Sequence, residues 1–281
     1  MRRSGGTGFY VPLSGGADSA TVVSLVYFLA LLLHESIKNE PDILAGLRKI
    51  VRNEAFTPKS AQEIVGNILF TSYLGSSNSS SDTKKRAKDL AQEIGSNHSE
   101  LDITPICEEF KKCIHKSLKF EPKFELNGGS YQEDLSLQNL QARTRMVLSY
   151  LIAQLIPPLQ LKKPGFLLVL GTGNLEEALS GYITKYDCSS SDINPIGSIS
   201  KLDLKEFLKF GVKDLKLKSL ESIIKAKPSA ELKPLDPLSN GEGQTDEEDM
   251  GMTYEELKAM GHARKALKCG PVSMYREMRA E

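Results

Sequence analysis

A stretch of six small and polar residues near the N-terminus, SGGADS at positions 14–19, constrains the fold more than any other feature of the chain. The apolar residues 8–13 precede it and the apolar residues 20–27 follow it. This pattern predicts a buried strand, a tight turn and a helix, with the turn at the helix N-terminus. Two adjacent glycines let the backbone fold back so that N–H groups converge on phosphate oxygens. A serine- and glycine-rich turn that merely caps the helix is the alternative interpretation.

The acidic residue of this turn, Asp18, restricts the kind of ligand that the turn can bind. A carboxylate is unfavourable in an anion-binding turn unless it holds a divalent cation that bridges the phosphates. The turn also lacks the Gly-Lys-Ser/Thr ending of a Walker A motif, so transfer of a γ-phosphoryl group is not expected. The SGGxDS pattern resembles instead the pyrophosphate-binding loop of the ATP pyrophosphatases, which adenylate a substrate and release pyrophosphate.

Length and composition limit the number of domains and the kinds of partner that the chain can have. The 281 residues suffice for one large α/β domain or two modest ones. The 36 basic and 36 acidic residues balance, so bulk charge predicts no nucleic-acid partner. The four cysteines have no CxxC spacing, which is typical of reduced thiols in a cytoplasmic protein. The longest apolar stretch, residues 24–33, is too short to span a bilayer, and the N-terminus has no signal-peptide pattern, so no membrane association is expected.

The rest of the chain alternates between expected strands and helices. Strands are expected at residues 67–74, 100–103 and 165–171, and helices at 82–94 and 135–156. The longer helix, ended by Pro157 and Pro158, carries one apolar stripe of Leu140, Thr144, Val147, Leu148, Leu151 and Leu155. Residues 41–62 are helical or an inserted excursion, and the Pro/Gly/Ser-rich residues 228–243 are expected to form a mobile lid. The alternation predicts an α/β fold with a doubly wound parallel sheet and ligands at the carboxyl ends of its strands.

A second group of polar residues, GTGNLEE at positions 171–177, follows the last expected strand. Glu177, one helical turn in, could complete the coordination of a metal ion held by Asp18. Glu176 and Glu177 could equally do no more than complement a helix dipole, and the segment alone leaves both interpretations open. A turn-rich loop, residues 192–200, then leads to the cation of Lys201.

Four segments together resemble the NAD synthetase family: SGGADS, LQNLQARTRM (137–146), GYITKYDCSSSDINPIGSISK (181–201) and QTDEEDMGMTY (244–254). The similarity is to the synthetase domain of the eukaryotic-type, glutamine-dependent members and covers nearly the whole chain. It implies a Rossmann-like fold of the adenine nucleotide α-hydrolase type. It also implies an ATP- and Mg²⁺-dependent amidation of deamido-NAD (nicotinic acid adenine dinucleotide) to NAD. The nicotinate carboxylate would attack the α-phosphorus of ATP, pyrophosphate would leave, and ammonia would then displace AMP.

The resemblance implies roles for individual residues. The pyrophosphate of ATP would be held by Ser14, Gly15, Gly16, Ala17, Asp18 and Ser19, with further ATP contacts from Thr172, Lys201 and Ser229. Asp18 and Glu177 would be the Mg²⁺ ligands, and Asp18 and Lys201 would act in catalysis. Deamido-NAD would bind Arg145, Lys185 and Asp192, with Arg143 as the alternative to Arg145. Ser229 stands where the motif usually has threonine and keeps the hydroxyl.

Other polar residues receive structural interpretations. Cys188 has no base spaced to activate it and is expected to be a packed thiol. The four histidines show no metal-ligand spacing. The acidic run at 246–249 is expected to start a helix, where its charge complements the dipole.

The chain departs from the family pattern at both ends. Nothing before Ser14 matches the nitrilase-like glutaminase domain of the family, and the C-terminal His-Lys pair near the dinucleotide phosphates is missing. We therefore expect residues 1–281 to be the synthetase domain of a longer protein, a partial gene model or a separate subunit. Ammonia would come from a glutaminase domain elsewhere or from solution, and the resemblance implies a homo-oligomer.

Alternative functions share the first motif. Another ATP pyrophosphatase, such as a GMP synthetase-like amidotransferase or a tRNA thiolase, would also carry SGGxDS. A thiolase should show paired catalytic cysteines or a basic RNA-binding face, and neither pattern is present. A non-catalytic nucleotide-binding or assembly module is the alternative from a different class.

Overall fold

The computed structural model of the chain describes residues 4–227, 231–234 and 246–279. At its centre is a parallel sheet with the strand order β3-β2-β1-β4. The strands are β1 (Phe9–Pro12), β2 (Leu69–Gly75), β3 (Asn97–Asp102) and β4 (Leu168–Val169). Tyr10 of β1 lies opposite Phe70 on one side and Val169 on the other. The predicted α/β class with a parallel sheet is confirmed.

The helices alternate with these strands. In chain order they are α1 (Ala17–Ser36), α2 (Pro41–Val51), α3 (Ala61–Ile68), α4 (Ser81–Ile94), α5 (Thr104–Leu118), α6 (Tyr131–Leu159), α7 (Leu175–Ser180), α8 (Lys201–Lys213), α9 (Leu220–Lys225), α10 (Asp246–Met250), α11 (Tyr254–Lys265) and α12 (Pro271–Met278). A short 3₁₀ turn at Glu125–Asn127 precedes α6.

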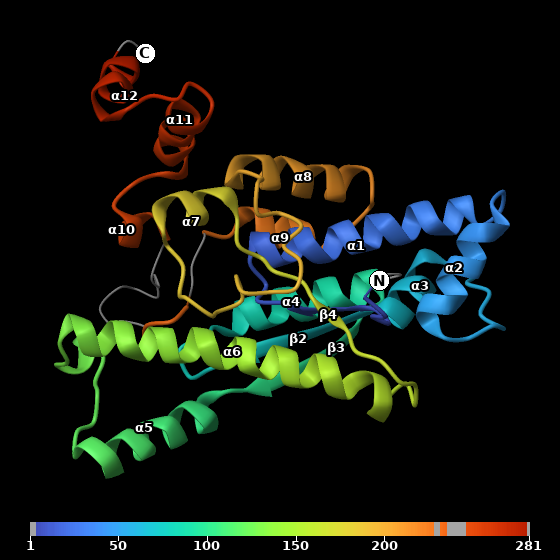
Figure 1. The fold of residues 1–281 in the computed structure, drawn as a ribbon, viewed down its shortest axis with the longest axis horizontal. Helices are drawn as coiled ribbons and strands as arrows, with labels where there is room; N and C mark the ends of the chain where they lie inside the picture. The colour runs from blue at the N-terminus through green and yellow to red at the C-terminus, as the bar shows by residue number, and fades with distance from the viewer. Residues whose placement is uncertain (1–3, 228–230, 235–245, 280–281) are drawn as a thin grey trace.

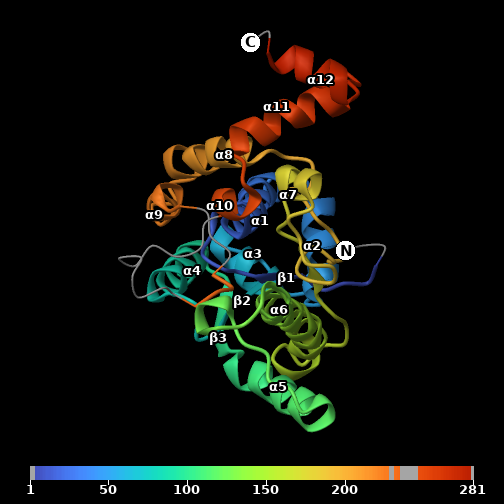
Figure 2. The same ribbon diagram turned by 90° about the vertical axis from the view of Figure 1, so that its left-hand side faces the viewer.

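Helices cover both faces of the sheet, as Figures 1 and 2 show. On one face, the side chains of α1, α3, α4, α8 and α9 form the larger hydrophobic core with Val11 and Leu69. On the other face, α6 packs against Tyr10, Phe70 and Val169, and α5 lies outside it. Helices α11 and α12 project from this body beside α7 and α8. The doubly wound arrangement is therefore confirmed.

The winding reverses direction next to β1. The connections from β1 to β2 and from β2 to β3 run through α1–α3 and α4 on the larger core face, whereas the connection from β3 to β4 runs through α5 and α6 on the opposite face. A crevice opens outside the carboxyl ends of two neighbouring strands where the direction reverses, and ligands of such sheets bind there. The loops after β1 and β4 flank this crevice.

The predicted end of the long helix is wrong. Helix α6 runs through Pro157 and Pro158 to Leu159 instead of stopping before them. A proline inside a helix leaves the carbonyl four residues earlier without its partner. Here the carbonyl of Ala153 instead accepts a hydrogen bond of 2.9 Å from the backbone N–H of Leu167. The proline therefore frees an acceptor that ties α6 to the approach of β4.

The other boundaries differ more modestly. The second strand starts at Leu69 because α3 continues to Ile68, and the third strand starts at Asn97, three residues before its predicted start. Only Leu168–Val169 of the predicted strand 165–171 forms a regular ladder, although the amide of Leu170 still donates to the carbonyl of Tyr10 at 2.9 Å. The predicted helix at 82–94 is present as α4, and Gly95 closes it in the left-handed conformation.

Helix α1 is long and apolar enough to cross a membrane by length and composition alone. Its first three turns are buried on nearly every side, and the predicted apolar stretch 24–33 lies inside it. It packs against β1, α3 and α8. Burial between the sheet and α8 therefore accounts for its apolar composition.

Candidate functional site

The SGGADS turn connects β1 directly to α1, as predicted. Gly15 takes the left-handed conformation with φ +81°, and Gly16 is the N-cap of α1. The hydroxyls of Ser14 and Ser19 lie 3.0 Å apart, and the Ser19 hydroxyl also accepts the Ser14 amide at 3.2 Å. Gly16 has no side chain that could accept hydrogen bonds from the first-turn N–H groups of α1. The positive end of the helix dipole is therefore left uncapped at the crevice. The turn is thus held by its own hydroxyls in a form that suits an anion.

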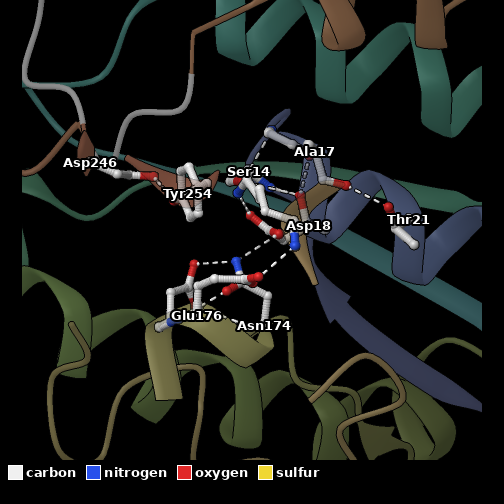
Figure 3. A network of polar contacts seen from close by, with 12 residues as sticks. Ser14, Ala17, Asp18, Thr21, Asn174, Glu176, Asp246 and Tyr254 are labelled. Carbon is white, nitrogen blue, oxygen red and sulfur yellow. Dashed lines mark hydrogen bonds and ion pairs between the residues drawn. The ribbon is translucent and has the colours of Figure 1, made fainter. Parts of the chain in front are cut away.

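Asp18 faces the loop after β4 (Figure 3). Asn174, the N-cap of α7, donates from Nδ2 to Asp18 Oδ1 at 3.1 Å and to Glu177 Oε1 at 2.9 Å. The two predicted metal ligands, 159 residues apart in sequence, therefore meet at one amide group. Burial, and then the Asp18 carboxylate, raises the pKa of Glu177 to about 8.

Lys201 is the buried cation of the site. Only 2% of its side chain is exposed, and its ammonium forms an ion pair with Asp18 Oδ2. The N-cap hydroxyl of Ser200 starts α8 and thereby points Lys201 inward. Burial by itself would lower the pKa of Lys201, but the carboxylates of Asp18, Glu177 and Asp246 outweigh it and raise that pKa. The lysine therefore stays charged at neutral pH.

Sequence reasoning missed three buried residues around Lys201. The ring of Tyr254 lies 5.3 Å from the Lys201 ammonium, and its hydroxyl donates to Asp246 Oδ2 at 3.0 Å. Asp246 does start helix α10, as predicted for the acidic run, but it is 93% buried and faces the site instead of solvent. Glu176, treated as a dipole charge, is fully buried and accepts the backbone N–H of Lys201 at 2.9 Å. Asp246 and Tyr254 belong to the QTDEEDMGMTY segment, and its resemblance to the family was the signal that could have pointed to them.

Two cavities meet at this cluster. The first, of about 300 Å³, is lined by the SGGADS turn together with Arg86, Arg145, Lys201 and Asp246. The second, of about 590 Å³, is lined by Arg143, Glu177, Thr184 and Lys185 among others. Asp18 and Thr172 line both cavities. The arrangement offers two adjoining binding spaces with a carboxylate at their junction.

The two candidate arginines point to different cavities. Arg145 Nε donates to the carbonyl of Leu74 at 2.9 Å and lines the first cavity. Arg143 lines the second cavity, and its Nε donates to the carbonyl of Lys185 at 2.9 Å. Arg143, and not Arg145, therefore shares a cavity with Lys185.

Asp192 is not brought to either cavity. Its Oδ2 accepts the amide of Val169 at 2.8 Å, and its Oδ1 accepts the hydroxyl of Tyr150 at 3.3 Å. These contacts fix the loop after β4, and the role of Asp192 in binding deamido-NAD stays a prediction. Ser229 and most of the predicted lid lie outside the described residues.

The segment 231–234, which lies within the predicted lid, is hydrogen-bonded to the start of α4, to the loop before α4 and to α6. The carboxylate of Glu231 accepts the amide of Ser80 at 3.1 Å and the hydroxyl of Thr83 at 2.9 Å. The side-chain amides of Asn78 and Gln141 both donate to the carbonyl of Leu232, at 2.9 and 2.7 Å. Glu231 thereby places its negative charge at the N-terminus of α4, where the helix dipole favours it.

The donor set around Asp18 fits Mg²⁺. Among the described residues no group of three or more histidine, cysteine or acidic side chains is arranged to hold a metal by itself. Mg²⁺ is commonly bound by one or two carboxylates that share it with substrate phosphates and water. Asp18 and Glu177 would supply two hard oxygen ligands beside the SGGADS turn, and the raised pKa of Glu177 indicates a site that favours added positive charge.

Cys188 lies in the wall between the two cavities. Burial, and then the neighbouring Asp187, raises the pKa of its thiol to about 12. A thiol with this pKa is not ionised at neutral pH, so Cys188 is unsuited to nucleophilic attack.

Comparisons with known proteins identify the family of the chain. The "Glutamine-dependent NAD(+) synthetase" of Bos taurus is 48% identical over 277 residues, which are 98% of this chain and 39% of that protein. The protein of the same name from Dictyostelium discoideum is 45% identical over 283 residues, covering 100% of this chain and 39% of its own length. The chain thus spans about two fifths of the length of these curated relatives.

Solved structures share the fold. A glutamine-dependent NAD(+) synthetase from Cytophaga hutchinsonii aligns with a TM-score of 0.73 at 23% identity, over 99% of this chain and 42% of that one. An NH3-dependent NAD synthetase from Campylobacter jejuni aligns with a TM-score of 0.55 at 23% identity, over 99% and 85% of the two chains. The SGGADS turn alone is compatible with any ATP pyrophosphatase, but the NAD synthase family model matches residues 1–266, and the chain therefore belongs to the NAD synthase family.

Proposed function

We propose that this domain converts deamido-NAD to NAD in an ATP-dependent amidation with an adenylated intermediate. An oxygen of the nicotinate carboxylate forms a bond to the α-phosphorus of ATP while the bond to pyrophosphate breaks. The nitrogen of ammonia then forms the amide bond, AMP leaves with the electron pair of the broken bond, and one proton is lost. Neither step requires a protein nucleophile, so positioning and charge neutralisation carry the catalysis.

One observation carries this proposal: two adjoining cavities share Asp18 and Thr172. A reaction between ATP and a dinucleotide needs two binding spaces whose reacting ends meet. The first cavity contains the SGGADS turn and several cations, Arg145 and Lys201 among them, which suit a triphosphate. The second contains Arg143 and Lys185, which suit the phosphates and the carboxylate of deamido-NAD.

Separate groups of residues would bind pyrophosphate, the metal ion and deamido-NAD. The turn from Ser14 to Ser19 would bind the leaving pyrophosphate, and Lys201 would offset the negative charge that develops on it. Asp18 and Glu177 would hold Mg²⁺, which supplies charge neutralisation of the phosphates when bound. Arg143 and Lys185 would orient deamido-NAD toward the α-phosphorus.

We propose that ammonia reaches the domain from a glutaminase domain. The curated relatives are named as glutamine-dependent enzymes, and this chain spans only 39% of their length. Such a domain, nitrilase-like as the resemblance implies, would lie in the remaining part of the protein.

A homo-oligomer is the second proposed association. Val147, Leu151, Leu155 and Leu159 form an exposed apolar row on α6, with exposed fractions from 43 to 68%. Phe110 and Leu118 of α5 are also at least half exposed. Exposed apolar surface of this extent is typical of protein–protein contacts and supports association of this face.

The test compares wild-type protein with Asp18→Asn, an isosteric change that removes the charge, and with the control Glu35→Gln at the exposed far end of α1. With ATP, Mg²⁺, deamido-NAD and ammonium, the wild type and the control are expected to form NAD, AMP and pyrophosphate in equal amounts. Asp18→Asn is expected to release pyrophosphate about a hundredfold more slowly or worse.

Calorimetric titration with ATP distinguishes the alternative function. A non-catalytic nucleotide-binding module would bind ATP and release no pyrophosphate in the presence of deamido-NAD. That result would refute the proposed function, whereas Asp18→Asn turnover equal to wild type would remove Asp18 from the mechanism.

A further inference from the structure

Asn174 occupies the point where the loop after β4 meets the phosphate-binding turn. It is the N-cap of α7, and only 1% of it is exposed. Asn174 lines neither cavity, so the proposed reaction gives it no direct contact with ATP or deamido-NAD. It does touch both residues that would hold Mg²⁺: Asp18, as Figure 3 shows, and Glu177.

Every polar atom of the Asn174 side chain has a partner. Its Oδ1 accepts the backbone N–H of Glu177 at 3.0 Å, which is an ordinary N-cap bond. Its Nδ2 donates one hydrogen to Asp18 Oδ1 at 3.1 Å and the other to Glu177 Oε1 at 2.9 Å. The opposite orientation of the amide would direct its oxygen at two carboxylates, so the network fixes which end is nitrogen.

Helix capping explains only one of these three contacts, the bond from the Glu177 amide. Serine, threonine or aspartate would cap α7 as well as asparagine does, since each supplies an acceptor oxygen. None of them supplies two N–H groups from a single nitrogen to two separate carboxylates. The second function of the side chain is therefore specific to the amide and concerns Asp18 and Glu177.

The electrostatics show why such a donor matters. Once both acids are ionised, as metal ligands must be, their carboxylates repel each other, and the repulsion opposes their approach to a common ion. Lys201 pairs with the Asp18 oxygen that Asn174 does not contact, and the backbone amide of Asn174 donates to the second Glu177 oxygen at 3.2 Å. The side-chain amide thus fills the space between the two acids and donates to both.

We propose that Asn174 is a positioning residue that holds the carboxylates of Asp18 and Glu177 side by side for the Mg²⁺ that accompanies ATP. The inference rests on the proposed function for the identity of the ion and the nucleotide. It concerns the geometry of the ligand pair and not the chemical step. Loss of a group that orients metal ligands typically weakens metal affinity by about 10- to 100-fold.

Two substitutions separate capping from bridging. Asn174→Ser keeps an N-cap acceptor but has no amide to reach both acids, whereas Asn174→Ala loses both functions. For each protein, the Mg²⁺ concentration at half-maximal pyrophosphate release is measured at saturating ATP and deamido-NAD. Binding of Mn²⁺ in the presence of ATP is followed by electron paramagnetic resonance without turnover, and thermal unfolding is recorded without ligands.

In both variants the Mg²⁺ concentration at half-maximal pyrophosphate release is expected to rise at least about tenfold, and Mn²⁺ is expected to bind correspondingly more weakly. Asn174→Ser is expected to unfold at the wild-type temperature and to approach wild-type turnover at high Mg²⁺. If Asn174→Ser matches the wild type in both metal measurements while Asn174→Ala does not, Asn174 is only a cap and the inference is overturned.

The proposed function fails separately. A wild-type protein that forms no NAD but binds Mn²⁺ with ATP would refute the amidation. The Mn²⁺ measurement on Asn174→Ser would still decide the role of Asn174.

Discussion

The SGGADS turn allows a direct test, because its two glycines differ in backbone conformation and in the space available for a side chain. Gly15 has φ +81°, and an added Cβ would lie 2.2 Å from the carbonyl oxygen of Thr83 on α4. Gly16 has φ −89°, and its nearest neighbour would be the Ser14 hydroxyl at 3.4 Å. Gly15→Ala should therefore damage the fold of the turn, while Gly16→Ala should not.

The expected magnitude at Gly15 has two parts. Holding an alanine in the left-handed region costs about 1–2 kcal/mol. The overlap with Thr83 is not with a flexible side chain but with helix backbone, so α4 must move by about 1 Å, and misfits of this kind cost roughly 1–3 kcal/mol. The sum is about 2–5 kcal/mol, against less than about 1 kcal/mol for Gly16→Ala, where the contact is ordinary.

The displacement should also affect nucleotide binding. Arg86 Nε donates to the carbonyl of Gly15 at 3.1 Å and lines the first cavity. Moving α4 away from the turn would break this bond and shift the guanidinium. Gly15→Ala is therefore expected to lose ATP binding together with stability.

Thermal unfolding and ATP titration check these expectations. For a chain of this size about 2 °C accompanies each kcal/mol, so Gly15→Ala should lower Tm by roughly 4–10 °C and Gly16→Ala by about 2 °C or less. Equal shifts for the two variants, or a Gly15→Ala protein that binds ATP like the wild type, would refute the reasoning from backbone conformation and contact.

Two further predictions follow from the charges of the site. Burial and Asp18 raise the pKa of Glu177 from 4.5 to about 8, so the folded protein retains a proton that the unfolded chain loses. The free energy of unfolding should therefore fall as pH rises from about 4.5 to about 8, and Glu177→Gln should reduce that fall by on the order of 4 kcal/mol. Denaturant midpoints at pH 5 and pH 9 measure the difference, and parallel pH profiles of variant and wild type would contradict it. Lys201→Met leaves the buried acids without their cation and should lower the free energy of unfolding at pH 8 by about 3 kcal/mol, with a smaller loss at pH 5, where Glu177 is protonated. Thermal unfolding without nucleotide tests this, and an unchanged Tm at pH 8 would count against the ion pair.

The parts of the fold that depend on residues close together in the sequence could be predicted from it. The strand, turn and helix around SGGADS follow from an apolar run, two glycines and a second apolar run, all within 20 residues. The start of α7 was indicated for the same reason, since the acids Glu176 and Glu177 follow the expected strand closely and favour a helix N-terminus. Local chemistry of this kind needs no knowledge of the rest of the chain.

Contacts between distant residues were not accessible. Tyr254 and Asp246 meet Lys201 across about 50 residues of sequence, and nothing near the acidic run distinguishes the buried Asp246 from a solvated helix start. The apolar stripe of α6 was found, but periodicity cannot tell that Val147 and Leu151 face solvent while Met146 and Ala153 face the sheet. Which of two apolar faces is buried depends on the element that packs against it.

The balance of charge around Lys201 links stability to the proposed metal binding. Asp18, Glu177 and Asp246 converge on one ammonium, and burial raises the pKa of both Glu177 and Asp246. A metal ligand must be deprotonated, so Mg²⁺ has to displace the proton of Glu177, and Mg²⁺ affinity should rise with pH until about 8. The free energy of unfolding that is lost between about pH 4.5 and about pH 8 becomes available to binding when a cation joins the acids. Burial of the acids thus weakens the fold and favours the uptake of positive charge, which is the relation expected where a site is built for a reaction and not for stability.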